Sequence, residues 1–192
     1  MKNLFKVTFV ALLAAVMVSC GSASKEDFVG QWTPDLSSID IHLSEDIPSD
    51  LSQNLDIDEM KAEAKKGQSE ADKVIIDFKE DGKLVLGPEG DTKEFNWDID
   101  GDNLVISGKM DEGPSEIKGK EFELAFEIVE SGSDAFTIKL SAMSLKEQLE
   151  AQFKDEMDEA MSQVGPMMSL INDDILTDTW ASISFKKKEA ES

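Results

Sequence analysis

One cysteine, one histidine and 41 carboxylates are the side chains of this 192-residue chain best suited to chemistry. Cys20 has no second cysteine with which to form a disulfide or a multi-cysteine metal site. His42 lies among Asp40, Glu45 and Asp46, and no second histidine is available to complete a metal or nucleophilic site. We therefore expect His42 to lie in a solvated loop.

The short motifs that mark common active sites are missing. The chain has no G-x-S-x-G, no phosphate-binding G-x-x-x-x-G-K-[ST] and no H-E-x-x-H. Pairs of carboxylates occur at almost any spacing, so they carry little information about glycoside hydrolysis. Residues 98–103 (DIDGDN) suggest a calcium loop, but Asn103 and Lys109 stand where an EF-hand needs glycine and glutamate. We expect neither an enzyme, nor a cofactor, nor a dedicated metal site.

The charge balance limits the partners. All 19 basic residues are lysine, and the net charge is −22. Phosphate recognition needs a basic face, and arginine is the side chain best suited to it, so we exclude nucleic acid as a partner. The acidic excess also disfavours anionic ligands, whereas a neutral lipid, a sugar or a basic protein fits it. The hydrophobic content of 40% is enough for a packed core.

Residues 1–19 have the pattern of a signal peptide. Lys2 and Lys6 precede an apolar run at 7–18, which is too short to span a bilayer comfortably. The run leads into MVSCG at 17–21, which resembles the lipobox of bacterial lipoproteins. The resemblance implies cleavage before Cys20 and the attachment of acyl chains, such as palmitate, to Cys20. The N-terminal lipid would then anchor the protein to a membrane.

The residues after Cys20 bear on the location. Two or three acyl chains hold a protein on a membrane durably. Gly21 is unlike the aspartate that retains enterobacterial lipoproteins in the inner membrane, which favours the Gram-negative outer membrane. Residues 25–27 (KED) resemble an export tag for the cell surface, and a solvated charge run explains them equally well. Surface and periplasmic locations both stay open. Loss of residues 1–19 removes two lysines and no acid, which takes the charge to −24.

Beyond a tether at 20–27, apolar and polar residues alternate in short segments, the pattern of an antiparallel sheet. The segment 121–128 (EFELAFEI) is the clearest example. Asp81-Gly82 and Asp100-Gly101 suit hairpin turns, because glycine tolerates a positive φ. We predict eight strands, near residues 28–33, 73–79, 83–87, 93–100, 103–109, 120–130, 134–141 and 179–187.

Two helical inserts, at about 34–72 and 144–174, interrupt the strands. The first contains a helix that begins with a capping box at 56–59 (DIDE) and ends by Gly67. The second begins with a capping box at 144–147 (SLKE), carries an apolar stripe and is bent at Gly165-Pro166. We expect this second helix to belong to the core, near Trp180. One domain spans 28–188, followed by a tail at 189–192.

The segment FVGQWT at 28–33, with Gly30 and Trp32, and the hairpins DFKEDGKLVL and FNWDIDGDNLVISG resemble the bacterial lipocalin-like domain proteins. The resemblance covers roughly residues 28–140 and 179–187. It implies a mainly β fold, an eight-stranded antiparallel barrel of the lipocalin-like (calycin) type. In lipocalins this tryptophan closes one barrel end beneath a basic side chain. Gly30 and Trp32 would then be structural, with a lysine among 186–188 as the cover.

The resemblance implies a non-catalytic cell-envelope lipoprotein that binds a small apolar or amphiphilic ligand. The aromatic and methionine side chains that could line its cavity are Trp97, Phe122, Phe126, Phe136, Phe153, Met157 and Met161. In the alternative, these residues simply fill and cover the barrel. The acidic outer surface would then engage a basic protein partner or another envelope component. A barrel interior filled by aromatic rings would favour this alternative.

Overall fold

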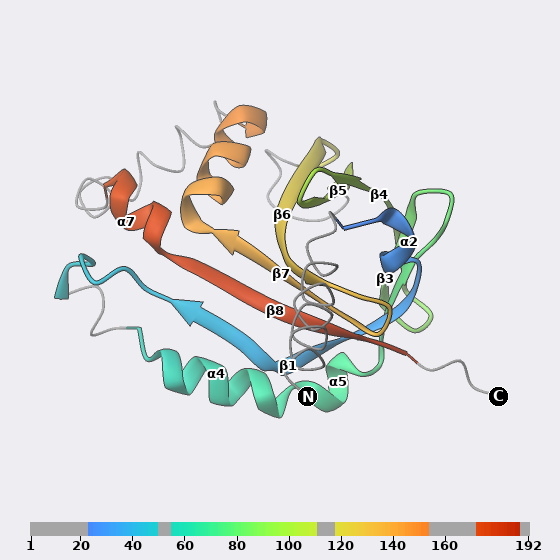
Figure 1. The fold of residues 1–192 in the computed structure, drawn as a ribbon, viewed down its shortest axis with the longest axis horizontal. Coiled ribbons are helices and arrows are strands. Elements are labelled where there is room, and N and C mark those ends of the chain that lie inside the picture. The colour runs from blue at the N-terminus through green and yellow to red at the C-terminus, as the bar shows by residue number, and fades with distance from the viewer. Residues whose placement is uncertain (1–22, 50–54, 111–117, 154–171, 189–192) are drawn as a thin grey trace, which may run out of the picture.

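The structure is a computed structural model that describes residues 23–49, 55–110, 118–153 and 172–188. It is mainly β, with eight antiparallel strands that form a closed barrel in sequence order (Figure 1). This confirms the predicted fold class, an architecture consistent with a lipocalin-like barrel. The strands are β1 (Gly30–His42), β2 (Val74–Phe78), β3 (Lys83–Pro88), β4 (Lys93–Asp100), β5 (Asn103–Lys109), β6 (Glu121–Ser131), β7 (Ala135–Ser141) and β8 (Trp180–Lys187).

The first strand is longer than predicted. We placed its end at residue 33 and a helical insert from 34, but β1 continues to His42. β1 contains a bulge between Asp35 and Asp40. Asp35 pairs with Ser184 of β8, whereas Asp40, five residues later, pairs with Ser182, only two residues away on β8. Inside the bulge, the Ser38 hydroxyl accepts the backbone N–H of Ser184 at 2.8 Å. A bulge breaks the two-residue alternation from which strands are predicted.

An ion pair holds the start of this bulge. The Asp35 carboxylate lies 2.6 Å from Lys186 Nζ and also accepts the backbone N–H of Ser37 at 3.0 Å. The hydrogen bonds from Lys186, the larger cause, and from Ser37 lower the pKa of Asp35 to about 2. A carboxyl whose pKa is lower in the folded than in the unfolded state stabilises the fold at pH values above the pKa of the unfolded state. That stabilisation is lost as the pH falls from about 4 to about 2.

We therefore expect Asp35→Asn to lower the free energy of unfolding by about 1–2 kcal/mol at neutral pH, a value reduced because solvent screens the exposed Lys186. At a pH near 2 the same substitution should have much less effect, because the wild-type carboxyl is then about half protonated in the folded state and most of its stabilisation has been lost. Urea unfolding of both proteins at the two pH values measures this difference. An equal loss of stability at both values would contradict it.

Helices cover the outside of the barrel. α4 (Ile57–Lys66) and α5 (Gln68–Ala71) contact β1, as Figure 1 shows. The predicted start of α4 is confirmed, because the Asp56 carboxylate accepts the backbone N–H of Glu59 at 2.9 Å. The helix ends at Lys66 and Gly67 caps it, which agrees with the predicted end by Gly67. These features are local in sequence, which is why the sequence reveals them.

The second insert begins earlier than predicted. A helix starts at residue 142, directly after β7, and its described part ends at residue 153. The Ser141 hydroxyl accepts the backbone N–H of Ser144 at 3.0 Å, so the predicted capping box at 144–147 is wrong and Ser141 caps the helix. The predicted bend at Gly165-Pro166 lies outside the described residues. α7 (Asp173–Asp178) then leads into β8.

A short helix, α2 (Lys25–Phe28), closes one end of the barrel. We predicted a tether up to residue 27. Instead, the Asp27 carboxylate accepts the backbone N–H of Ser24 at 3.1 Å and holds the first turn of this helix. Phe28 is fully buried, and its carbonyl accepts the Trp32 indole N–H at 2.6 Å. We call α2, Trp32 and the rings packed around them the closed end.

Most of the core lies at the closed end. Its buried members are Phe28, Trp32, Ile76, Phe78, Leu84, Trp97, Leu104, Phe136 and Ile138. Lys187 Nζ lies 5.4 Å from the centroid of the Trp32 ring, within the range of a cation–π contact. Gly30 has a φ of +129°, and a Cβ at this position would lie 2.9 Å from Lys187 Cε. Glycine thus lets the chain bring Lys187 across Trp32.

Candidate functional site

An apolar cavity of about 270 Å³ lies beyond the core, toward the other end of the barrel. This volume exceeds that of the roughly 150 Å³ engineered cavity that binds benzene. Side chains from β1, β6, β7 and β8 line it: Ile39, Phe126, Ile138, Leu140, Ala181 and Ile183, with Lys139 and Ser182 alongside. Ala181 is exposed although it lines the cavity, so the cavity opens to solvent.

The strand register explains the space. At the closed end, Phe136 pairs with Phe185, and their rings stack with centroids 4.7 Å apart. Along the same strands, the next two pairs on the inner face are Ile138 with Ile183 and then Leu140 with Ala181. The side chains on the inner face therefore become smaller toward the open end. The bulge in β1 adds Ile39 to the lining.

Two of the aromatic residues predicted to line a cavity lie in the core instead. Trp97 and Phe136 are each 2% exposed. The Trp97 ring packs against Phe78 at 5.0 Å, and the Phe136 ring packs against Phe28 at 4.8 Å. Neither lines the cavity, because contacts within the closed end bury both rings. Phe126 lines the cavity.

Of the remaining predicted lining residues, the two that the structure describes lie elsewhere. Phe122 packs its ring against Phe95 with centroids 5.8 Å apart. Phe153 is 4% exposed at the end of the described part of the helix at 142–153. Met157 and Met161 lie outside the described residues. The sequence pattern therefore identified one of the described lining residues, Phe126.

Sequence reasoning missed the other lining residues for identifiable reasons. The alternation in β7 and β8 already placed Leu140, Ala181 and Ile183 on one face of their strands. The missing information was the register that pairs β7 with β8, strands separated by the whole second insert. Ile39 lies in the bulge of β1, in a segment predicted to be part of a helical insert. Its short apolar-polar alternation with Ile41 was the available signal.

We predicted that His42 lies in a loop, but it is the last residue of β1. Its ring stacks on Trp180 at 5.5 Å, and its Nε2 lies 3.5 Å from the Asp178 carboxylate. β8 pairs His42 with Trp180, which adjoins the inward-facing Ala181 and therefore points to the outer face. Lys139 Nζ lies 5.8 Å from the Trp180 ring. This cluster supports the outer wall and does not enter the cavity.

The described part of the chain offers the cavity little besides apolar contact. Among the residues described, no three His, Cys, Asp or Glu side chains gather as metal ligands would. Lys139, beside the cavity, has its Nζ 2.8 Å from the Glu127 carboxylate. The arrangement can therefore hold an apolar group by burial.

None of the helices in the described ranges is both long and apolar enough to cross a membrane. Comparison of the chain with models of protein families, with curated proteins and with solved structures gives no match.

Proposed function

We propose that this protein is a non-catalytic lipoprotein of the Gram-negative outer membrane, anchored through Cys20, whose barrel binds a small apolar or amphiphilic ligand. The observation that carries the ligand proposal is the solvent-open cavity of about 270 Å³ with its apolar lining. Burial of apolar surface contributes roughly 25 cal/mol per Å², so such a lining favours an apolar guest. The anchor proposal rests on the sequence at 17–21.

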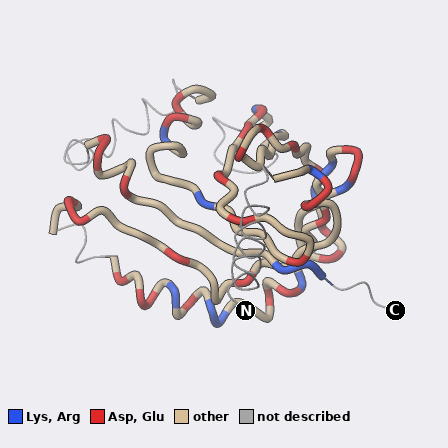
Figure 2. Tube along the Cα trace, in the orientation of Figure 1, with Lys and Arg blue, Asp and Glu red and all other residues tan. Residues whose placement is uncertain are grey.

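Charge favours an uncharged ligand. The chain carries a net charge of −22, and acidic residues occur on strands, helices and turns, as Figure 2 shows. Lys139, the cation beside the cavity, is already paired with Glu127. A carboxylate or phosphate group would therefore meet a negative field with its nearest cation already engaged. Neutral molecules avoid this cost.

The cavity also separates this proposal from the alternative of a purely external, charge-driven binding protein. That alternative expects an interior filled by Trp97, Phe122, Phe126 and Phe136. Trp97 and Phe136 fill the closed end, whereas Phe126 borders open space. The placement of Phe126 supports an internal ligand.

A fluorescent probe tests the proposal. We expect residues 21–192 to bind the neutral fluorophore N-phenylnaphthylamine saturably and to bind anionic anilinonaphthalene sulfonate more weakly. Ala181→Trp should fill the cavity and weaken binding at least about tenfold, a change of about 1.4 kcal/mol. Ala135→Trp is the matched control, because Ala135 adjoins the buried Phe136 and points outward. Equal affinities of wild type and Ala181→Trp would contradict the proposal, as would failure of the wild type to bind.

A further inference from the structure

Beside the cavity, the pairing between β6 and β7 that forms the barrel wall comes to an end. The ladder between β6 and β7 reaches the pair Glu127 and Lys139 toward the open end. The next residues beyond that pair, Phe126 and Leu140, both line the cavity. β6 begins at Glu121, whereas β7 ends at Ser141. The edge of β6 that would face a longer β7 therefore has no strand partner among the described residues.

Two glutamine side chains take the place of that strand. Gln148 accepts the backbone N–H of Ala125 at 2.6 Å and donates to its carbonyl at 3.0 Å. Gln152 makes the same two bonds to Glu123, each at 2.6 Å. Each amide thus reproduces the paired bonds by which one strand residue meets its opposite. We call these four residues the glutamine seam. The helix at 142–153 supplies both glutamines as the continuation of β7 (Figure 1).

The glutamine seam has a hollow on its outer side as well. A groove of about 450 Å³ is lined by the four seam residues together with Glu121, Phe122 and Ala151. Phe122 packs on Phe95, a residue in contact with the core, so the groove reaches side chains that face the interior. On the inner side, Phe126 and Leu140 border the cavity. Ala125 lines the groove and the next residue of β6, Phe126, lines the cavity, so the two hollows adjoin the same stretch of strand.

We infer that the ligand is an amphiphile that passes through the glutamine seam, with its apolar tail in the cavity and an uncharged, hydroxylated head group in the outer groove. This inference rests on the proposed function. The groove offers carboxylate acceptors on Glu121 and Glu123, and hydroxyl groups of a ligand can donate to them. The same two carboxylates disfavour an anionic head group.

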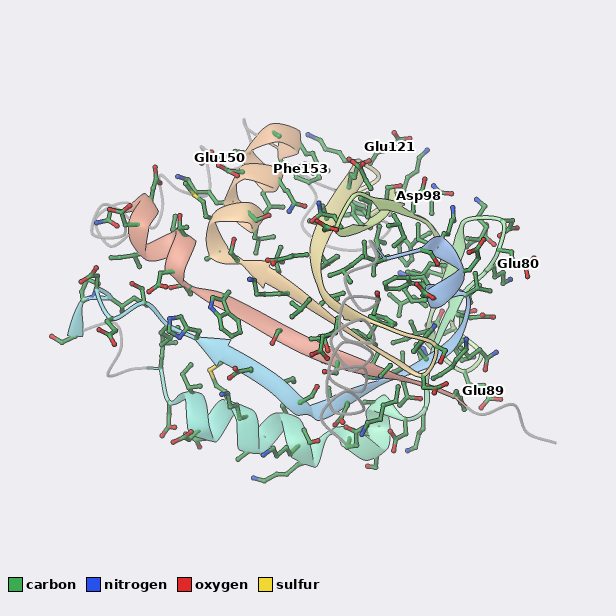
Figure 3. All side chains as sticks on the ribbon, in the orientation of Figure 1. Glu80, Glu89, Asp98, Glu121, Glu150 and Phe153 are labelled. Atoms are coloured by element: carbon green, nitrogen blue, oxygen red, sulfur yellow. The ribbon has the colours of Figure 1, made fainter. Side chains whose placement is uncertain are left out.

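The seam is also the part of this wall that can open locally. Its hydrogen bonds join neutral groups, and those between Gln152 and Glu123 are exposed, so water can replace them. The Ser141 cap holds the start of the helix, and the buried Phe153, in the described part of the helix, favours the closed position. Figure 3 shows Phe153 on the helix near the Glu121 end of β6. Separation of the glutamines from β6 would join the cavity and the groove.

A removable cross-link across the groove tests this inference. Ala125→Cys and Ala151→Cys place thiols at two groove positions of the 21–192 protein, which has no other cysteine, and leave both groove carboxylates in place. A short bis-methanethiosulfonate reagent would join them and leave Gln148 and Gln152 unchanged. We expect the cross-linked protein to bind dodecyl maltoside, below its micelle concentration, at least tenfold more weakly than the reduced protein. N-phenylnaphthylamine, small enough for the cavity alone, should bind both forms within about twofold.

The outcomes separate the two proposals. Restoration of dodecyl maltoside binding by a reducing agent supports passage through the seam. Equal binding of dodecyl maltoside before and after cross-linking would overturn the inference, as would binding of the small probe without binding of the amphiphile by the reduced protein. Failure of the reduced protein to bind either probe would instead refute the proposed function. The same cross-link between cysteines at Glu70, in α5, and Lys73, just after it, is the matched control, because both side chains are exposed.

Discussion

Phe136→Ala is expected to lower the free energy of unfolding by about 3–5 kcal/mol, the range for removing a large side chain from a packed core. The Phe136 ring lies 4.8 Å from Phe28, 4.7 Å from Trp32 and 4.7 Å from Phe185, centroid to centroid. It therefore joins α2, β1, β7 and β8 at the closed end. With 2% of its surface exposed, its removal leaves a void that surrounding rings can fill only in part.

Urea unfolding followed by circular dichroism measures this loss, and the melting temperature should fall by roughly 2–4 °C per kcal/mol. Phe126→Ala is the matched control, since it removes the same ring from a partly exposed position beside existing space. We expect it to cost less than half as much as Phe136→Ala. Equal losses from the two substitutions would show that the closed end is not the main core.

The strands were predictable because the alternation of apolar and polar residues can be seen within each segment alone. In β6, Phe122, Leu124 and Phe126 share the inward face of one short segment, and no knowledge of another strand is needed to see this. The hairpin turns are equally local. Gly82 and Gly101 have φ values of +83° and +59°, which glycine adopts readily and other residues rarely adopt. Each of these features lies within about ten residues of chain.

The bulge and the cavity were not predictable in this way, because they depend on distant partners. Ser38 stabilises the bulge through Ser184, 146 residues away. Leu140 and Ala181 leave space between them only once β7 and β8 are paired in the observed register. The sequence shows which side chains face inward, whereas the size of the space also depends on which of them meet.

The glutamines illustrate the same limit. Gln68 accepts the backbone N–H of Leu36 at 2.7 Å and donates to the Pro34 carbonyl at 2.9 Å. Gln68 therefore hydrogen-bonds to the backbone at the edge of β1 much as Gln148 does at the edge of β6. In sequence these are ordinary polar residues of helical segments. Their role depends on where a neighbouring strand stops, which no local pattern records.

The second large effect concerns the proposed anchor and follows from a short connection. α2 begins at Lys25, five residues after Cys20, and an extended chain covers about 3.3–3.6 Å per residue. The acyl chains would therefore lie within roughly 18 Å of the closed end. α2 is fixed to the barrel by the buried Phe28 and by Lys25, whose Nζ lies 3.0 Å from the Asp98 carboxylate. An anchor on Cys20 would hold the closed end toward the membrane and direct the open end away from it.

Cys20→Ala should abolish lipid attachment altogether, because Cys20 is the only thiol in the chain. We expect the variant to take up no labelled palmitate and either to keep its signal peptide or to leave the membrane fraction. Its barrel should be unaffected, since residue 20 precedes α2 and every strand. Binding of N-phenylnaphthylamine and the urea midpoint of the purified variant should then equal those of residues 21–192, which separates loss of the anchor from loss of the fold. If wild type takes up no palmitate while the variant still sediments with outer membranes, the anchor does not depend on Cys20. Uptake by wild type alone, together with unchanged probe binding, would place the lipid and the ligand on two independent parts of the molecule.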